Sequence, residues 1–257
     1  MKICVLASGS KGNMTYIEAG NTRLLIDAGI TLTNAKRRNS TLDLGNVTDI
    51  LITHEHGDHV GYLDTVYKKT NANIFMSKKS FNGLRPNFRD KFVGVKVGFL
   101  EPESRYKIGD VMVTTFKLSH DCSEVLGYIV SYKDKKVGYF TDTGIFPDRY
   151  LKYLNDLDVL IFEANHNVEK LLNSNREFHL IQRILSTEGH ISNNKCFEIL
   201  SKTLTEKNKY VILAHVSEDC NSEQCLYEDI INKLYNYNGK IIIASQHEAS
   251  EVIDLGE

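Results

Sequence analysis

The sequence reads His54-Glu55-His56-Gly57-Asp58-His59 directly after the apolar run Asp49-Ile50-Leu51-Ile52. Apolar residues then recur at helical spacing, at Val60, Leu63, Val66 and Tyr67. This order predicts a buried strand, a polar loop and an amphipathic helix, with Asp58 near the helix start. Loops at the end of a sheet often carry ligands and catalytic groups. Core packing does not explain so many imidazole and carboxylate groups in one short loop, which therefore predicts a metal site.

The loop cannot supply a complete set of ligands, because residues so close in sequence cannot all reach one ion. Three further residues of ligand type each follow a predicted strand, namely His120 after 111–118, Asp142 after 136–141 and His215 after 210–214. A polar residue at a strand end is common, and for any one of the three this explanation is as good as a ligand. The repeated pattern favours ligands. Imidazole and carboxylate groups suit Zn, Mn or Fe.

The series His54-x-His56-x-Asp58-His59, His120, Asp142 and His215 resembles the motifs of the metallo-β-lactamase-fold hydrolases. The segment Leu24–Gly29, with Asp27 after a strand, is similar to the first motif of that family, so the resemblance covers nearly the whole chain.

A finer resemblance, to the YycJ/WalJ (VicX) branch, rests on Leu6–Asn13, Glu163–His166 and Gly189–Asn193. Asn167 stands where this branch is expected to have Asp, and Lys11 where Ser is commoner. Neither difference falls on a predicted metal ligand. Members of this branch are nucleases with 5′-to-3′ exonuclease activity on DNA, so the resemblance implies DNA as the substrate.

The resemblance also implies two divalent ions, Zn or Mn with Fe possible, and divides the ligands between them. It gives His54, His56 and His120 to one ion and Asp58, His59 and His215 to the other, with Asp142 as the bridge. Such ions share a hydroxide that attacks the phosphodiester. Asp27 is expected to orient a ligand histidine through its N–H.

Asp58, Glu163 and His190 are the candidate catalytic residues. Glu163-Ala164 and Gly189-His190 resemble the tRNA-processing endonucleases, in which a carboxylate orients a histidine that protonates the leaving oxygen. The alternatives are a surface carboxylate at a strand end for Glu163 and a plain loop residue for His190.

Two residues are candidates for substrate binding. His166 is expected in a neighbouring loop that faces the substrate. Lys11 lies in the loop Ser8–Asn13, which could present backbone N–H groups to a phosphate; the alternative is a plain turn. The loop lacks the spacing of a P-loop.

The composition, with 42% hydrophobic and 25% charged residues, is ordinary for a soluble globular protein. The pattern of strands and helices given below predicts an α+β fold. We expect one domain over residues 1–257, because no linker or repeat interrupts the chain. No apolar stretch is long enough to span a membrane. The five cysteines are odd in number and scattered, which indicates reduced thiols and a cytoplasmic protein. Cys122 is better explained as a small loop residue than as a ligand. The sequence carries no signal for an oligomeric state.

Strands are predicted to dominate residues 1–56 and 92–142, with a hairpin formed by 128–132 and 136–140. Further strands are predicted at 158–162, 209–213 and 240–244. The predicted helices are 58–69, 148–155, 178–187, 192–204 and 222–236, with Ser192 and Ser222 as caps. Two mixed sheets packed face to face, with helices on both outer faces, would bury the apolar faces of these elements. This αββα sandwich is also what the resemblance implies.

The net charge of −2 does not by itself indicate nucleic-acid binding. Basic residues are nevertheless clustered at Lys36-Arg37-Arg38 and within residues 78–96, where Phe81 and Phe88 interrupt them. Aromatic rings in a basic stretch can stack on unpaired bases. The alternative is a solvated face with both rings in the core.

Three functions stay open: a metal-dependent DNA exonuclease, a hydrolase of small phosphodiesters or thioesters, and a non-catalytic regulator that kept the fold. The intact ligand set favours an enzyme.

Overall fold

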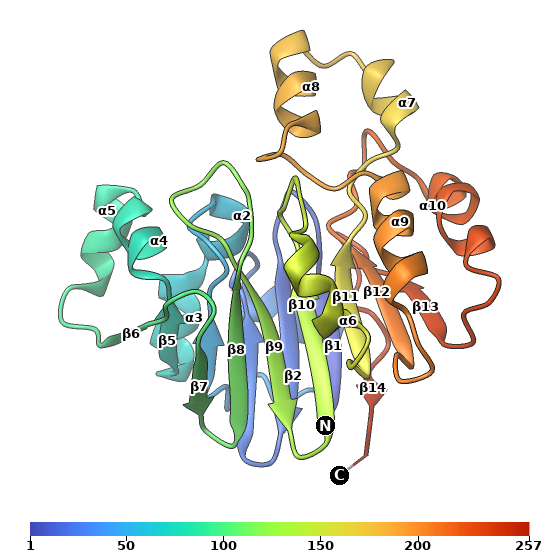
Figure 1. The fold of residues 1–257 in the computed structure, drawn as a ribbon. Coiled ribbons are helices and arrows are strands. Elements are labelled where there is room, and N and C mark those ends of the chain that lie inside the picture. Colours follow the sequence, from blue (N-terminus) through green and yellow to red (C-terminus); the bar gives the residue numbers. More distant parts are fainter. Residues whose placement is uncertain (257) are drawn as a thin grey trace.

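Two seven-stranded sheets pack face to face in the computed structural model, which describes residues 1–256 (Figure 1). The first sheet has the order β14-β1-β2-β3-β4-β5-β6, with bounds Ile253–Asp254, Lys2–Ala7, Met14–Ala19, Thr22–Ile26, Asp49–Leu51, Asn73–Met76 and Val97–Phe99. The second has the order β13-β12-β11-β10-β9-β8-β7, with bounds Lys240–Ile243, Tyr210–Ala214, Val159–Glu163, Lys135–Phe140, Leu126–Tyr132, Val111–Lys117 and Arg105–Ile108. Each sheet contains parallel and antiparallel pairs, so both are mixed.

Helices cover the outer face of each sheet. The first sheet is covered by α1 (Leu32–Arg38), α2 (Gly57–Val60), α3 (Leu63–Thr70), α4 (Lys78–Gly83) and α5 (Pro86–Arg89), which share a buried apolar cluster with its strands. The second is covered by α6 (Leu151–Leu154), α9 (Asn193–Thr203) and α10 (Glu223–Asp229). A third cluster, between the sheets, draws residues from both. These layers confirm the predicted αββα sandwich. Residue 257 of the predicted single domain lies outside the described residues, and the extent of the domain stays a prediction.

The predicted ligands lie at one edge of this sandwich. Strands β3 and β4 are parallel to each other, as are β10, β11 and β12, so within each group the carboxyl ends lie at the same edge. Strand β8 runs in the same direction as β10, because each is antiparallel to β9. The predicted ligands and Glu163 come at the ends of β4, β8, β10, β11 and β12 or shortly after them. Met1 and Gly256 lie at the opposite edge, where the Met1 amino group donates to the Gly256 carbonyl at 2.5 Å (Figure 1).

Several helices differ from the prediction. The helix predicted over 58–69 is two helices, α2 and α3, because the chain breaks at Gly61-Tyr62 and the Tyr62 amide donates to the Ala28 carbonyl at 2.9 Å. The helix predicted over 222–236 is α10 followed by a short 3₁₀ helix, Ile231–Lys233. Helices α1, α4, α5 and α7 (Val168–Leu172) were not predicted.

The predicted helix caps, the hairpin and the helix over 178–187 are confirmed. The side chains of Ser192 and Ser222 cap α9 and α10, and β9 and β10 form the hairpin. Residues 178–187 contain α8 (Phe178–Leu185). All five cysteines are free, and among residues 1–256 no helix is long and apolar enough to cross a membrane.

A tyrosine joins the two sheets next to the ligand edge. The hydroxyl of Tyr128 on β9 donates to the carbonyl of Ile52, just after β4, at 2.5 Å, and the ring is fully buried. We predict that Tyr128→Phe lowers the free energy of unfolding by about 1–2 kcal/mol, because it removes the donor from a buried carbonyl. Urea unfolding measures this, with the exposed Tyr227→Phe as the control. Equal stability of the two variants would contradict the prediction.

Candidate metal centre

Three histidines form one group of metal-ligand type. His54 and His56 lie in the loop between β4 and α2, and His120 follows β8. One nitrogen of each lies within 4.8 Å of the others. The ring centroid of His120 is 5.2 Å from that of His54 and 5.0 Å from that of His56. The three rings therefore face a common point.

A second group lies beside the first. Asp58 and His59 belong to α2 and His215 follows β12; one ligand-type atom of each lies within 4.8 Å of the others. Asp142 lies between the groups, with its carboxylate 3.4 Å from His59 Nε2 and 3.3 Å from His215 Nε2. It also clusters with His54 and His59. The structure thus brings all seven predicted ligands together.

Three residues around this centre adopt the left-handed backbone conformation. The φ angles are 64° at Asp27, 59° at Asp142 and 53° at His215, each directly or shortly after a strand. Such angles cost free energy in residues other than glycine and persist where the surroundings enforce them. The chain therefore turns sharply at these three positions, and this sharp turn places the side chains at the edge of the sheets.

Hydrogen bonds orient the ligand-type rings. His59 Nδ1 lies 2.8 Å from Asp27 Oδ2, and His120 Nδ1 lies 3.1 Å from the Gly189 carbonyl oxygen. These contacts turn the Nε2 atom of each ring toward the centre. The contact of Asp27 is the one predicted for it. A contact that was not predicted is that of Asn13, whose Nδ2 lies 3.1 Å from Asp58 Oδ2 and 3.0 Å from His59 Nε2.

Atoms that lack hydrogen-bond partners test whether the site fits a metal. The Nε2 atoms of His54 and His215 and the Oδ2 atom of Asp142 are buried, and none has a hydrogen-bond partner within residues 1–256. Buried polar atoms are normally paired, so unpaired ones converging on one point need a ligand. Imidazole and carboxylate donors fit divalent Zn, Mn or Fe. The residues present therefore fit divalent ions.

The electrostatics of the two groups differ. Burial, with the nearby charge of His59, lowers the pKa of His54, and burial lowers the pKa of His120, which favours the neutral form that ligates a metal. Burial also acts to lower the pKa of His215, but Asp142, Asp58 and Glu163 outweigh it and raise the pKa to about 10. The same carboxylate cluster therefore attracts positive charge, as a cation site must.

Glu163 and His190 lie beside this cluster. Glu163 ends β11 and is fully buried, which excludes the alternative of a surface carboxylate. Its Oε1 lies 2.7 Å from His190 Nδ1 and 3.2 Å from His215 Nδ1, and its Oε2 accepts from the Thr143 amide at 2.9 Å. Burial raises the pKa of Glu163, but the charge and hydrogen bonds of the two histidines outweigh it and lower the pKa to about 2. Glu163 is thus an ionised carboxylate fixed by hydrogen bonds, and it orients His190. The side chain of His190 is 18% exposed.

The substrate-binding candidates fit less well. His166 is 1% exposed, with Nε2 buried and unpaired within the described chain, so it does not lie in an open loop. Burial lowers its pKa to about 4. The Lys11 ammonium pairs with Glu218 at 2.6 Å. The roles of both residues in binding substrate stay predictions.

Three amides of the loop Ser8–Asn13, which could have been presented to a phosphate, donate within the protein. The amide of Gly9 donates to Asn13 Oδ1 at 2.9 Å, that of Lys11 to Gln246 Oε1 at 2.7 Å, and that of Asn13 to the Asp58 carbonyl at 2.8 Å. The first of these bonds closes the loop on itself, the second ties it to the segment after β13, and the third ties it to the ligand segment at Asp58. The loop therefore helps to fix the position of the ligand segment.

The basic stretch within residues 78–96 does not expose free aromatic faces. Phe81 and Phe88 pack against the apolar cluster between the first sheet and its helices, with Phe88 also beside Phe92 at a centroid distance of 5.6 Å. Lys79 and Lys91 pair with acidic residues. The structure thus favours the alternative of a solvated face over partly buried rings.

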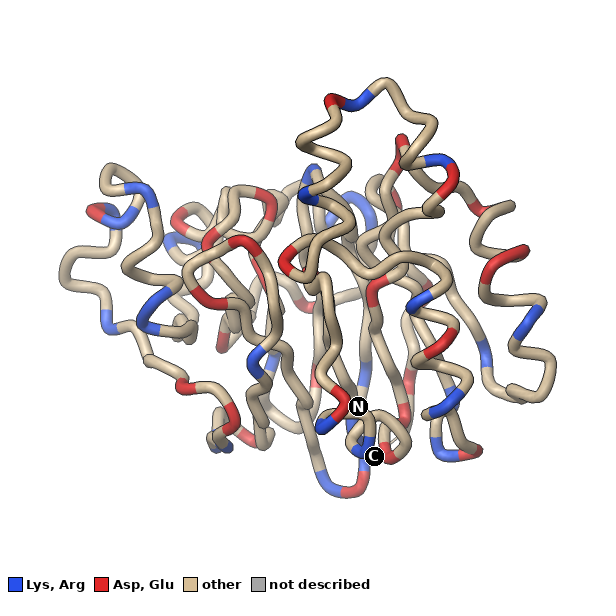
Figure 2. Tube along the Cα trace, turned by 45° about the horizontal axis from the view of Figure 1, so that its top comes forward, with Lys and Arg blue, Asp and Glu red and all other residues tan. Residues whose placement is uncertain are grey.

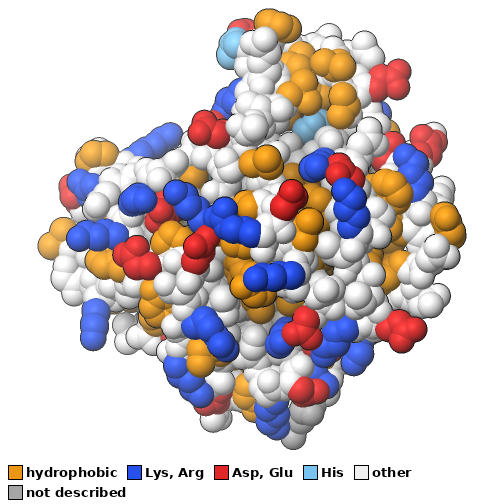
Figure 3. Space-filling model, viewed as in Figure 1, with side chains coloured by type: hydrophobic (Ala, Val, Ile, Leu, Met, Phe, Trp, Pro, Cys, Tyr) orange, Lys and Arg blue, Asp and Glu red, His pale blue; other side chains and the backbone are white. Residues whose placement is uncertain are grey.

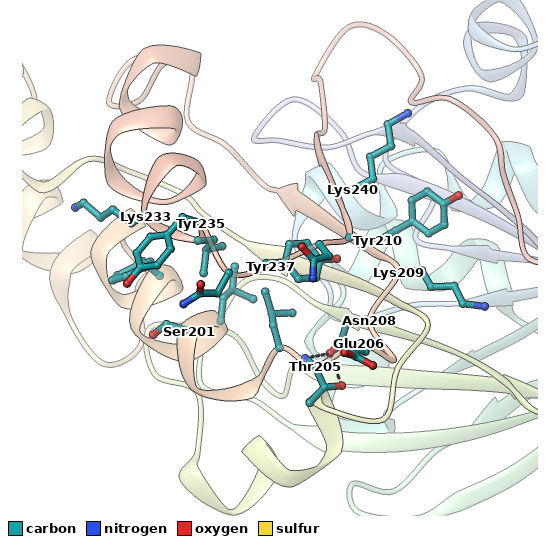
Figure 4. A pocket seen from close by; sticks show the side chains of 17 residues that line it. Ser201, Thr205, Glu206, Asn208, Lys209, Tyr210, Lys233, Tyr235, Tyr237 and Lys240 are labelled. Carbon is teal, nitrogen blue, oxygen red and sulfur yellow. Dashed lines mark hydrogen bonds between the residues drawn. The ribbon is translucent and has the colours of Figure 1, made fainter.

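A large cavity lies away from the centre. Its volume is about 830 Å³, and it is lined by α9, by residues 204–210 and by residues 233–240, including the aromatic Tyr235 and Tyr237 (Figure 4). It opens at the start of β12, whereas His215 follows the end of that strand. No predicted ligand lines it, so its size does not mark the metal centre.

Comparison with known proteins identifies the family. Residues 22–215 match the beta-lactamase superfamily domain. The chain belongs to this superfamily. It is 32% identical over 222 residues to exodeoxyribonuclease YycJ of Bacillus anthracis, covering 86% of this chain and 84% of that protein. It is 31% identical over 241 residues to exodeoxyribonuclease WalJ of Streptococcus pneumoniae, and this match covers 91% of this chain and 88% of that protein. These matches place it in the YycJ/WalJ family, as the motifs predicted.

A solved structure shows the same fold. The metallo-β-lactamase fold protein YhfI of Bacillus subtilis superposes with a TM-score of 0.71 at 15% identity, covering 97% of this chain and 99% of that one. The predicted fold class is therefore confirmed by sequence and by structure.

We predict that Asp27→Asn weakens metal binding about 10- to 100-fold, because the amide no longer fixes His59 as the carboxylate does. Competition with a chelating dye measures the affinity. Asp49→Asn is the matched control, since Asp49 is a buried carboxylate bonded to Thr48 and Asn73 in the same sheet. Wild-type affinity in Asp27→Asn would contradict the orienting role.

Proposed function

We propose that this protein is a metal-dependent DNA exonuclease that removes nucleotides from 5′ ends. The observation that carries the proposal is the Glu163–His190 pair beside a convergent set of seven ligand-type side chains. The names of the YycJ and WalJ relatives support DNA as the substrate. From the free thiols we further propose a cytoplasmic location.

The ligand groups fit two ions, Zn or Mn. We assign His54, His56 and His120 to one and Asp58, His59 and His215 to the other, with Asp142 between them. Two of the four groups of ligand-type atoms support this division, and the other two contain Asp142. Two such ions supply an activated water and neutralise charge on the phosphodiester. Asp58 belongs to this set, so we propose that it contributes to catalysis by holding a metal ion.

His190 is the proposed general acid. Its Nδ1 is held by Glu163, and its ring stacks on that of His215 at a centroid distance of 5.1 Å and lies 4.9 Å from that of His120. The opposite ring nitrogen, Nε2, is therefore the one that can hand a proton to the leaving oxygen. Histidine suits this role because its ordinary pKa lies near neutrality.

We predict that His190→Ala lowers kcat about 10²- to 10⁴-fold with unchanged metal content, because it removes the proton donor and leaves the ligands. Metal analysis together with steady-state hydrolysis tests this. His179→Ala is the control, since His179 lies nearby on α8 with its side chain 77% exposed. A cleavage rate for His190→Ala within about threefold of wild type would remove His190 from the mechanism.

Charge distribution supports a second candidate, a hydrolase of small phosphodiesters or thioesters. Figure 2 shows Lys and Arg interspersed with Asp and Glu along the chain. The net charge of −2 agrees with this view. Nucleic-acid-binding proteins usually concentrate positive charge.

End-labelled linear duplex and a covalently closed circle separate the candidates. We predict that the linear duplex is shortened from its 5′ termini while the circle persists, that EDTA abolishes the activity and that Mn restores it. Bis-p-nitrophenyl phosphate serves as the small substrate. Cleavage of the circle at the rate of the linear duplex would indicate an endonuclease, and cleavage of the small ester alone would favour the second candidate.

A further inference from the structure

A helical projection stands over the metal centre. Helices α7 and α8 extend beyond the sheets, where hydrophobic side chains gather on the surface (Figures 1 and 3). The projection starts just after His166 and ends just before Gly189-His190, so both of its ends are tied to the site. The projection therefore lies next to the proposed site along the chain at both of its ends.

Arg183 links this projection to a ligand segment. Within α8, Ile181 and Ile184 pack toward Leu171 and Cys220. Arg183 instead donates through Nε to Asp121 Oδ2 in the loop after β8. At helical spacing, Arg183 lies on a different face from Ile181.

Asp121 places the Arg183 guanidinium close to the ligands. Asp121 follows His120, and its Oδ1 lies 3.3 Å from His120 Nε2. Its amide donates to the Glu188 carbonyl at 3.1 Å, which ties the loop to the end of the projection. The carboxylate therefore lies between the guanidinium and His120.

The guanidinium still has donors to spare. The bond to Asp121 uses Nε, and neither terminal nitrogen of Arg183 makes a hydrogen bond within the described part of the chain. The side chain is 54% exposed. An arginine fixed at one nitrogen with two free NH₂ groups matches the geometry of phosphate recognition.

Another basic side chain close to the ligands is Lys11, in the loop whose Asn13 contacts Asp58, and its ammonium is paired with Glu218. Arg183 is paired as well, with Asp121, but through Nε alone. Its two terminal nitrogens, which make no hydrogen bond within residues 1–256, are available to a phosphate.

We propose that Arg183 binds a phosphate of the DNA strand next to the phosphate that is cleaved, and so positions the strand end. The neighbouring phosphate fits because Asp121 separates the guanidinium from the ligands. The inference rests on the proposed exonuclease function and assigns one contact of its substrate.

The test removes charge from both partners. Arg183→Ala should lower kcat/KM on DNA about 10- to 100-fold and reduce the salt dependence of binding by about one phosphate contact. Neutral methylphosphonates are then placed singly at the linkages nearest the 5′ end. At one linkage the methylphosphonate should lower kcat/KM of the wild type about tenfold. It should lower kcat/KM of Arg183→Ala less than about twofold, because the contact is already gone. Additive losses at every linkage overturn the inference.

Controls separate this contact from a structural effect. Arg176→Ala removes an arginine of the same projection whose terminal nitrogen is bonded to Asp219 at 2.8 Å, and it should keep the wild-type response at every linkage. Arg183→Lys keeps a positive charge but lacks the planar guanidinium, and it is the variant to use if Arg183→Ala does not fold. Its coupling to the linkage, that is, its loss of kcat/KM when that linkage is neutralised, should be smaller than in the wild type. Full wild-type coupling in Arg183→Lys contradicts the fork geometry. Wild-type protein that leaves DNA intact overturns the proposed function together with this inference, whereas DNA degradation without coupling overturns the inference alone.

Discussion

One buried carboxylate holds together the segments that carry the ligands. Asp27 accepts from the Thr53 amide at 2.8 Å and lies 2.8 Å from His59 Nδ1, while its own amide donates to the Leu51 carbonyl at 2.8 Å. The end of β3, the loop after β4 and the helix α2 are thereby fixed to one another. The left-handed conformation of Asp27 is kept by these bonds, so strain in the backbone and order in the site have one origin.

The second sheet also has a buried carboxylate, Glu163, that orients residues of the site. Glu163 contacts Nδ1 of both His190 and His215 through Oε1, and its Oε2 accepts from the amides of Thr143 and Ile191. One buried carboxylate thus orients a ligand-type ring and the proposed acid together. The two sheets bring their anchors, Asp27 and Glu163, to the same edge, and the site forms where they meet.

The predictable part of the site is the part encoded by local pattern. A ligand-type residue after an apolar run singles out Asp142 and His215, which the fold brings beside the other ligand-type residues because the strand ends share an edge. The break at Gly61-Tyr62 was missed, because the apolar periodicity of 60–67 continues across it. The contact of Arg183 with Asp121 joins residues far apart in sequence, with no local pattern to signal it. The contacts of Asn13 likewise depend on how loops pack.

The central claim is that the histidines and aspartates of both sheets form one two-ion centre. Anomalous scattering from crystals of the protein grown with Mn tests it most directly. The account predicts two peaks roughly 3.5–4 Å apart, one against His54, His56 and His120, the other against Asp58, His59 and His215, with Asp142 touching both. A single peak, or peaks outside these residues, would contradict it.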